Sequence, residues 1–195
     1  KLVYISMLCN DTKISANNEL TGDPTETALV DMGFNLQFEK NIYDKNPRIK
    51  EIPFDSDRKL MTTVNKINNK YVVLTKGGVD ELLAKCNKYL YDGEERNDLE
   101  NYKKVITKNN EDMAKDALRV LSMAYKEIDH EPTDEEMKNI EQDLIYVGMV
   151  GMIDPPRLEV KDAVDKCEKA GIKTVMITGD HKITAVAIAK KLGIL

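Results

Sequence analysis

Residues 49–78 limit the possible folds most strongly, because they predict two β-strands joined by a tight turn. The segment reads IKEIPFDSDRKLMTTVNKI, then NNK and YVVLTKGG. Strand-forming residues stand on both sides of Asn68 and Asn69, a pair that suits a hairpin turn. Strands joined by such a turn are antiparallel. The sequence therefore predicts an antiparallel ribbon around Phe54 to Thr75.

Two helices flank this ribbon in the sequence. Residues 22–34, GDPTETALVDMGF, predict the first helix. Asp23 suits its N-cap, Pro24 its first helical position and Glu26 the capping-box position. After the ribbon, residues 80–86 predict a short second helix.

A long helix and two strands are predicted next. The polar segment YDGEERND predicts a turn before the helix. RVLSMAYKEI and IYVGMVGMI predict the strands, and between them Thr133 and Glu136 match a second capping box. Apolar residues recur at helical spacing in the long helix, at Leu99, Tyr102, Ile106, Met113, Ala117 and Leu118.

The pattern changes at the segment DPPR, residues 154–157. A helix with one apolar face follows and ends at Gly171, and then an all-apolar strand, Val175 to Ile177, precedes another helix. This alternation is typical of a parallel α/β unit whose strand is buried on both faces. We therefore predict an α+β domain over residues 1–150 and a partial α/β domain over residues 151–195.

Charge and cysteine content exclude several classes of protein. With 29 Lys+Arg against 34 Asp+Glu, the net charge of -5 argues against nucleic acid as a partner. Three widely spaced cysteines favour a reduced, cytosolic setting. The longest apolar run, VGMVGMI, is far shorter than the roughly 20 residues that span a bilayer. We expect a monomeric segment of a longer chain that is not itself inserted in a membrane.

Several residues of the first domain could bind a nucleotide. Phe54, followed by Arg58 and Lys59, combines a stacking surface with cations, although the ring could instead belong to the core and the charges to a solvated face. Lys76 stands before a glycine pair at a strand-to-helix junction, where a turn alone would also explain the glycines. A capping role would likewise account for Glu26.

Two further places could bind phosphate. Arg119 opens a predicted strand and is either a phosphate clamp or an ordinary rim arginine. Thr178, Gly179 and Asp180 join a strand to a helix, where backbone N–H groups can bind an anion, although many α/β proteins have such a corner. The two histidines are not paired with each other or with cysteines at ligand spacing, so we expect no zinc site.

Six segments together resemble, in order and spacing, the cytoplasmic region of P-type cation-transporting ATPases, and most closely the calcium pumps of the type II group. They are GDPTETAL, PFDSDRKLM, KGGVDELL, ALRVLSMAY, VGMVGMIDPPR and MITGDHKITAVAIAKKLGI. The resemblance covers almost the whole chain, and DPPR and MITGDHK are its most specific parts.

The resemblance implies that residues 1–150 form the nucleotide-binding domain, an antiparallel sheet flanked by helices. Residues 151–195 would be a partial parallel α/β unit of the haloacid-dehalogenase-like phosphorylation domain. The parent protein would be a membrane enzyme that moves cations, Ca2+ foremost, by ATP hydrolysis through an aspartyl-phosphate intermediate. Its implied cofactors are ATP and Mg2+, and the implied partners are the other phosphorylation, actuator and transmembrane domains. This region would lie on the cytoplasmic side of the membrane.

The resemblance also implies residue roles. Phe54 would stack on adenine, Lys76 would lie deep in the pocket, and Thr178, Gly179 and Asp180 would grip the transferred phosphoryl group. Asp154 and Arg157 would lie near the hinge between domains. The other implied nucleotide-binding residues are Thr25 and Glu26 beside the base, Lys59 and Gly77 near the lysine, and Arg119 at the phosphates.

Two departures from the family pattern limit how far the residue roles of the family apply to this chain. The lysine motif of the family reads K-G-A-P-E, whereas residues 76–80 read KGGVD, which leaves the turn less rigid. The motif D-K-T-G-T, whose aspartate is phosphorylated, and the downstream acidic motif that holds magnesium are absent from these 195 residues. We therefore expect this chain to bind nucleotide without phosphorylating itself. The alternatives are a phosphatase of the same superfamily, a non-catalytic interaction module, or a pump for Na+, K+, H+ or Mg2+.

Overall fold

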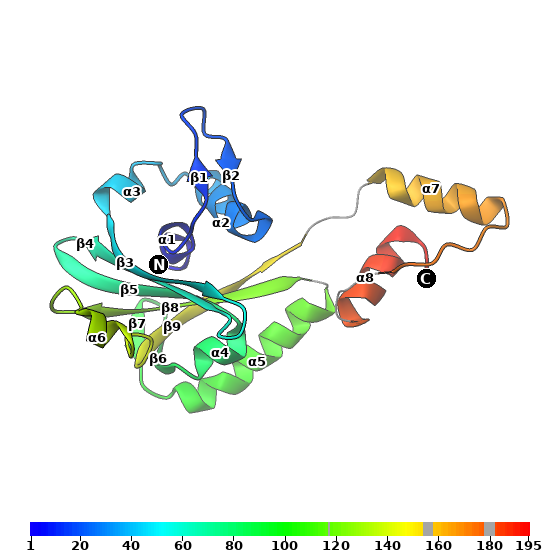
Figure 1. Cartoon of the computed structure of the whole chain (residues 1–195). Helices are drawn as coiled ribbons and strands as arrows, with labels where there is room; N and C mark the ends of the chain where they lie inside the picture. The colour runs from blue at the N-terminus through cyan, green and yellow to red at the C-terminus, as the bar shows by residue number, and fades with distance from the viewer. Residues whose placement is uncertain (117, 154–157, 178–181) are drawn as a thin grey trace. The chain divides into compact units, whose positions relative to one another are not determined.

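A seven-stranded sheet dominates the computed structural model, which describes residues 1–116, 118–153, 158–177 and 182–195 (Figure 1). Its strand order is β3-β4-β5-β8-β9-β6-β7. Neighbours from β3 to β8 are antiparallel, as are β6 and β7, whereas β6 and β9 are parallel. The strands are β3 (Arg48–Asp55), β4 (Leu60–Ile67), β5 (Lys70–Gly77), β6 (Cys86–Tyr91), β7 (Glu94–Arg96), β8 (Arg119–Ile128) and β9 (Leu144–Met152).

Helices flank the sheet, which confirms the predicted α+β class. A separate two-stranded sheet pairs β1 (Lys13–Ile14) with β2 (Leu20–Thr21). The helices are α1 (Leu2–Leu8), α2 (Pro24–Asn35), α3 (Ile42–Lys45), α4 (Val79–Leu83), α5 (Leu99–Lys115), α6 (Asp134–Met137), α7 (Leu158–Lys169) and α8 (Lys182–Leu192). Within the described residues, none of these helices is long and apolar enough to cross a membrane.

The predicted hairpin is formed by β4 and β5. Asn68 and Asn69 have φ angles of 50° and 64°, the left-handed backbone of a tight two-residue turn. The register aligns Thr62 with Thr75 and Met61 with Lys76. The β3–β4 register is irregular between residues 52 and 55, so that β3 has two residues, including Phe54, where β4 has Met61.

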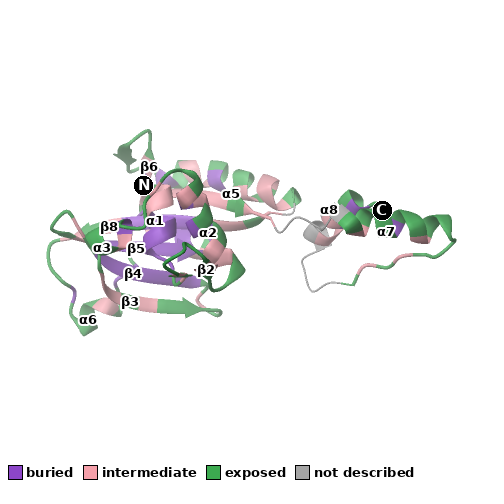
Figure 2. Ribbon diagram, turned by 90° about the horizontal axis from the view of Figure 1, so that it is seen from above, coloured by how far each residue is buried: buried purple, intermediate pink, exposed green. Residues whose placement is uncertain are grey.

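The two faces of the sheet carry different helices. Helix α1 packs against α2 and β5 on one face, and α4 lies against the opposite face of β5 (Figure 1). The α4 face contains a core cluster, and Figure 2 shows buried residues concentrated on β4, β5 and α1. The cluster consists of Leu60, Val64, Val73, Leu82, Ala124, Ile140 and Leu144.

The sequence did not predict β6 and β7. Helix α4 ends at Leu83, short of the predicted end near residue 86, and residues 86–91 form a strand. Strand β6 lies beside β9, which follows more than 50 residues later, and no hydrophobic period in CNKYLY indicates this pairing. The predicted polar turn is formed at Asp92 and Gly93, which have φ angles of 50° and 83°.

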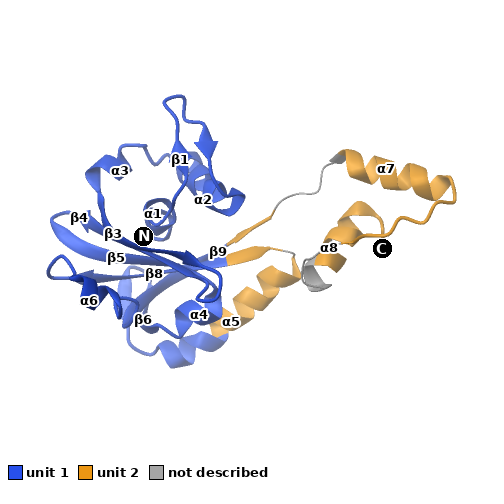
Figure 3. Ribbon diagram, viewed as in Figure 1, with its two compact units in different colours: residues 1–104, 121–150 blue, residues 105–120, 151–195 orange. Residues whose placement is uncertain are grey.

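The chain divides into two compact units, residues 1–104 with 121–150 and residues 105–120 with 151–195 (Figure 3). In the second unit α7 contacts α8, which confirms both predicted helices. The predicted strand at Val175 to Ile177 is not formed, and these two residues are 71% and 93% exposed. A strand needs a hydrogen-bonding neighbour, and none of the described strands pairs with this segment. The predicted domain limits at 150 and 151 stay a prediction.

Candidate functional site

Lys76 is a lysine buried on the α1 and α2 face of the sheet. It lies near the end of β5, and only 4% of its side chain is exposed. Its Nζ lies 2.5 Å from Oε1 of Glu26, the second residue after the start of α2. The ammonium makes no hydrogen bond of regular geometry with the described residues. Because a buried ammonium has three N–H donors and high desolvation cost, this group is under-satisfied.

Glu26 does not make the capping contact that its position predicts. Asp23 caps α2, and its Oδ1 accepts a hydrogen bond from the Thr25 N–H at 2.8 Å, as the sequence predicts. The Glu26 carboxylate does not close a capping box: Oε2 accepts from the Asp11 N–H at 3.0 Å and Oε1 faces Lys76. The capping interpretation is therefore wrong, because a buried ammonium and a backbone N–H compete successfully for this carboxylate.

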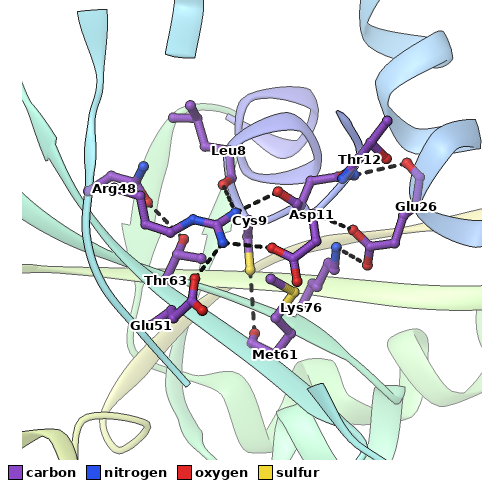
Figure 4. A network of polar contacts seen from close by, with 12 residues as sticks. Leu8, Cys9, Asp11, Thr12, Glu26, Arg48, Glu51, Met61, Thr63 and Lys76 are labelled. Carbon is purple, nitrogen blue, oxygen red and sulfur yellow. Dashed lines mark hydrogen bonds and ion pairs between the residues drawn. The ribbon is translucent and has the colours of Figure 1, made fainter. Parts of the chain in front are cut away.

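Arg48 organises the polar contacts beside this pair (Figure 4). Its Nη1 lies 2.6 Å from carboxylate oxygens of both Asp11 and Glu51. Its Nη2 donates to the carbonyl of Asn10 at 2.5 Å. The network continues to Lys76 through Asp11 and Glu26 (Figure 4). A planar guanidinium can serve several acceptors in this way, whereas an ammonium lacks its fixed geometry.

Cys9 lies beneath the same network as a protonated thiol. Burial raises its pKa, and its Sγ donates to the carbonyl of Met61 at 3.5 Å. Cys9, Asp11 and Arg48 were not predicted as site residues. Only their positions relative to Lys76 in space give them a role, and no local motif marks them.

Phe54 presents its ring to solvent, with 60% of the residue exposed. The core alternative for this side chain is therefore wrong. Phe54 lies at the level of Met61 on β4, and Met61 aligns with Lys76 on β5. Two strand spacings therefore separate the backbones of Phe54 and Lys76, about 10 Å.

Gly77 and Lys59 have structural explanations of their own. Gly77 has a φ angle of 158°, and a Cβ there would lie 2.1 Å from the carbonyl oxygen of Lys59, so the close approach of two backbones requires glycine. The Lys59 ammonium is exposed and lies 2.7 Å from Glu81 on α4. This pair raises the pKa of Lys59 and lowers that of Glu81. The structure thus brings Lys59 to α4 rather than to Glu26 and Lys76.

The remaining predicted site residues lie elsewhere. Arg119 begins β8 and belongs to the second unit. Thr178, Gly179 and Asp180 lie outside the described residues, as do Asp154 and Arg157. Among the residues that the structure does describe, no group of three or more His, Cys, Asp or Glu side chains could hold a metal ion.

Comparison with known proteins decides the family. The family model described as P-type ATPase, cytoplasmic domain N, matches residues 1–159. The chain belongs to this family. Its sequence is 50% identical to calcium-transporting ATPase 1 of Bacillus cereus over 96% of the chain, and 43% identical to a calcium-transporting ATPase of Listeria monocytogenes over 100% of it. The membership indicated by the sequence motifs is confirmed.

More distant relatives carry other names. The sodium/potassium-transporting ATPase subunit alpha of Hydra vulgaris is 34% identical over 100% of the chain. The chain spans only 21% to 22% of the length of these three relatives. This part of the P-type ATPase sequence is therefore shared by proteins named for different ions.

Proposed function

We propose that this domain N binds ATP for a membrane pump that transports Ca2+ by ATP hydrolysis through an aspartyl phosphate. The observation that carries the proposal is the buried, under-satisfied ammonium of Lys76 at the level of the exposed Phe54 ring. An ammonium and an aromatic ring suit a nucleotide, which offers a base to stack and polar atoms to accept hydrogen bonds.

The ligand would lie across β3, β4 and β5. Adenine would stack on Phe54, Lys76 would donate to the nucleotide, and Thr25 and Glu26 would lie beside the base. Mg2+ would arrive on the nucleotide phosphates. Gly77 would lie beside Lys76, and the family resemblance implies a role for Arg119 at the phosphates, whereas Lys59 pairs with Glu81 on α4. Because a domain that delivers ATP must also release it, we expect a dissociation constant of about 0.1 to several millimolar, or roughly 3 to 5.5 kcal/mol.

Replacing the stacking ring tests the proposal. Phe54→Ala should weaken ATP binding by about 1 to 3 kcal/mol, measured by NMR titration or calorimetry of the 195-residue chain. Tyr91→Ala is the matched control, because Tyr91 is also an exposed aromatic residue but lies on β6, which is separated from β3 by four strands. An unchanged affinity in Phe54→Ala would exclude the stacking role. No ATP-dependent shift of any amide near Lys76 would instead favour a non-catalytic interaction module.

The proposed whole protein places this domain on the cytoplasmic side of a membrane. Its further parts would be the rest of the phosphorylation domain, the actuator domain and the transmembrane domain. Thr178, Gly179 and Asp180 would bind the phosphoryl group, and Asp154 and Arg157 would lie near the hinge. The names of the Bacillus cereus and Listeria monocytogenes relatives support Ca2+. ATP hydrolysis by the full-length protein that responds to Na+ or K+ but not to Ca2+ would overturn that choice of ion.

A further inference from the structure

We propose that Arg48 is a positioning residue, which fixes the carboxylate of Glu26, and through it the ammonium of Lys76, by holding residues 8–11 in place. This proposal rests on the proposed function for its effect on nucleotide binding. Arg48 itself lies at the start of β3, on the far side of residues 8–11 from Glu26 in the contact network (Figure 4).

The first step is the hold of Arg48 on the segment after α1. Its guanidinium donates to the carbonyls of Asn10 at 2.5 Å and of Leu8 at 3.5 Å, and pairs with the Asp11 carboxylate at 2.6 Å. Glu51, which lies on the same strand as Arg48, provides the second carboxylate at 2.6 Å and helps to fix the guanidinium. The segment has little regular structure of its own, since α1 ends at Leu8.

The second step leads from this segment to α2. The Asn10 side chain is buried, and its Nδ2 donates to the backbone carbonyl of Glu26 at 2.9 Å and to that of Ser6 at 3.1 Å. Its Oδ1 accepts from the Thr12 N–H at 2.8 Å. The Asp11 N–H then donates to Oε2 of Glu26 at 3.0 Å. Both the backbone and the side chain of Glu26 are thus held by two consecutive residues.

The third step is electrostatic. With Oε2 held by Asp11, Oε1 of Glu26 remains directed at Lys76 Nζ, 2.5 Å away. If residues 10 and 11 move, the carboxylate loses one of its two partners and can follow a different rotamer. The ammonium of Lys76 would then lose its fixed counter-ion. Arg48 therefore controls the site from outside it, without touching the ligand.

Three variants and one matched control test this role in the 195-residue chain. Arg48→Gln removes the charge, Arg48→Lys keeps the charge but loses the planar arrangement of donors, and Glu26→Gln removes the charge through which Arg48 acts. Lys50→Gln is the control, because Lys50 is a cation of the same strand that pairs with the exposed Asp134. Two measurements are needed, ATP affinity by NMR titration and hydrogen exchange of the Asp11 amide.

A positioning role predicts coupling between the two residues. Arg48→Gln should weaken ATP binding about tenfold in the natural sequence but less than about twofold when Glu26→Gln is already present. Arg48→Lys should give an intermediate loss and serves for the same comparison if Arg48→Gln does not fold. Lys50→Gln should leave the affinity unchanged. Equal losses with and without Glu26→Gln would overturn the proposal, because Arg48 would then act on stability in general.

Hydrogen exchange separates this proposal from the proposed function. The Asp11 amide should exchange about tenfold faster in Arg48→Gln and in Glu26→Gln than in Lys50→Gln, whether or not ATP is present. If the chain binds no ATP but the amide responds in this way, the proposed function fails and the positioning contact stands. An Asp11 amide that exchanges equally fast in all variants overturns the positioning role, whatever the ATP affinity.

Discussion

Thr75 and Lys76 are neighbours on β5, and each leads to a carboxylate, the buried Glu141 and the half-buried Glu26. Successive side chains of a strand point to opposite faces of the sheet. On one face Thr75 bonds to Thr62 at 3.0 Å, and Thr62 donates to Glu141 at 2.5 Å. On the other face Lys76 lies 2.5 Å from Glu26. The same strand thus supports one acidic centre on each side.

The two centres differ in how fully their polar groups are satisfied. Oε1 of Glu141 accepts from both Thr62 and Arg58, and Arg58 also donates to the carbonyl of Pro53 at 2.6 Å. In contrast, Lys76 has an ion pair but no regular hydrogen bond within the described residues. A satisfied buried network stabilises and rigidifies a fold, whereas an under-satisfied one leaves donors for a ligand. The comparison therefore predicts that one face determines stability and the other binding.

The largest expected effect is the loss of stability in Glu141→Ala. The change leaves the Arg58 guanidinium and the Thr62 hydroxyl without their carboxylate acceptor, and removing one partner of such a partly buried ion pair should cost about 3 kcal/mol of unfolding free energy. Urea denaturation measures the loss. Glu135→Ala is the control, because Glu135 is an exposed glutamate of α6 that pairs with the exposed Lys138. A cost below that of the control variant would show that the Glu141 centre does not stabilise the sheet.

Lys76→Met should reduce ATP affinity more than it reduces stability. Losing a hydrogen bond from a charged group should weaken ATP binding by about 2 kcal/mol, or roughly thirtyfold. The unfolding free energy should fall by less than that of Glu141→Ala, because Glu26 keeps the Asp11 N–H as a partner. Lys70→Met is the matched control: Lys70 lies on the same strand, but it is exposed and pairs with Glu127. ATP affinity that is the same in both lysine variants would refute the proposed role of Lys76.

Much of the fold could be predicted because local chemistry determines it. Asn68 and Asn69 specify a tight turn wherever they lie, and the segment RVLSMAYKEI has the same limits as β8. The capping box of Thr133 and Glu136 is complete within four residues. In each case the residues that stabilise the element are the element itself or its immediate neighbours.

The sequence could not reveal contacts between distant segments. Nothing near Glu26 indicates that Lys76, 50 residues later, would draw it away from the helix cap, and Arg58 meets Glu141 across 83 residues. Strand β6 needs β9 beside it, and residues 175–177 have no neighbouring strand among those described. The motifs indicate residue types that suit a nucleotide, which stays a prediction, whereas the network around Arg48 depends on tertiary structure.

A third carboxylate, that of Glu136 on α6, should make the smallest contribution to stability. Glu136 is exposed and accepts hydrogen bonds from the Thr133 backbone, His130 and the Thr133 hydroxyl, which lower its pKa from 4.5 to about 2. A depressed pKa adds stability above pH 4.5, and this contribution is lost as the pH falls toward 2. Glu136→Gln should therefore lower the urea midpoint slightly at pH 6, and the difference from the natural chain should shrink by pH 3. A difference that persists unchanged at pH 3 would show that ionisation of Glu136 does not stabilise the cap.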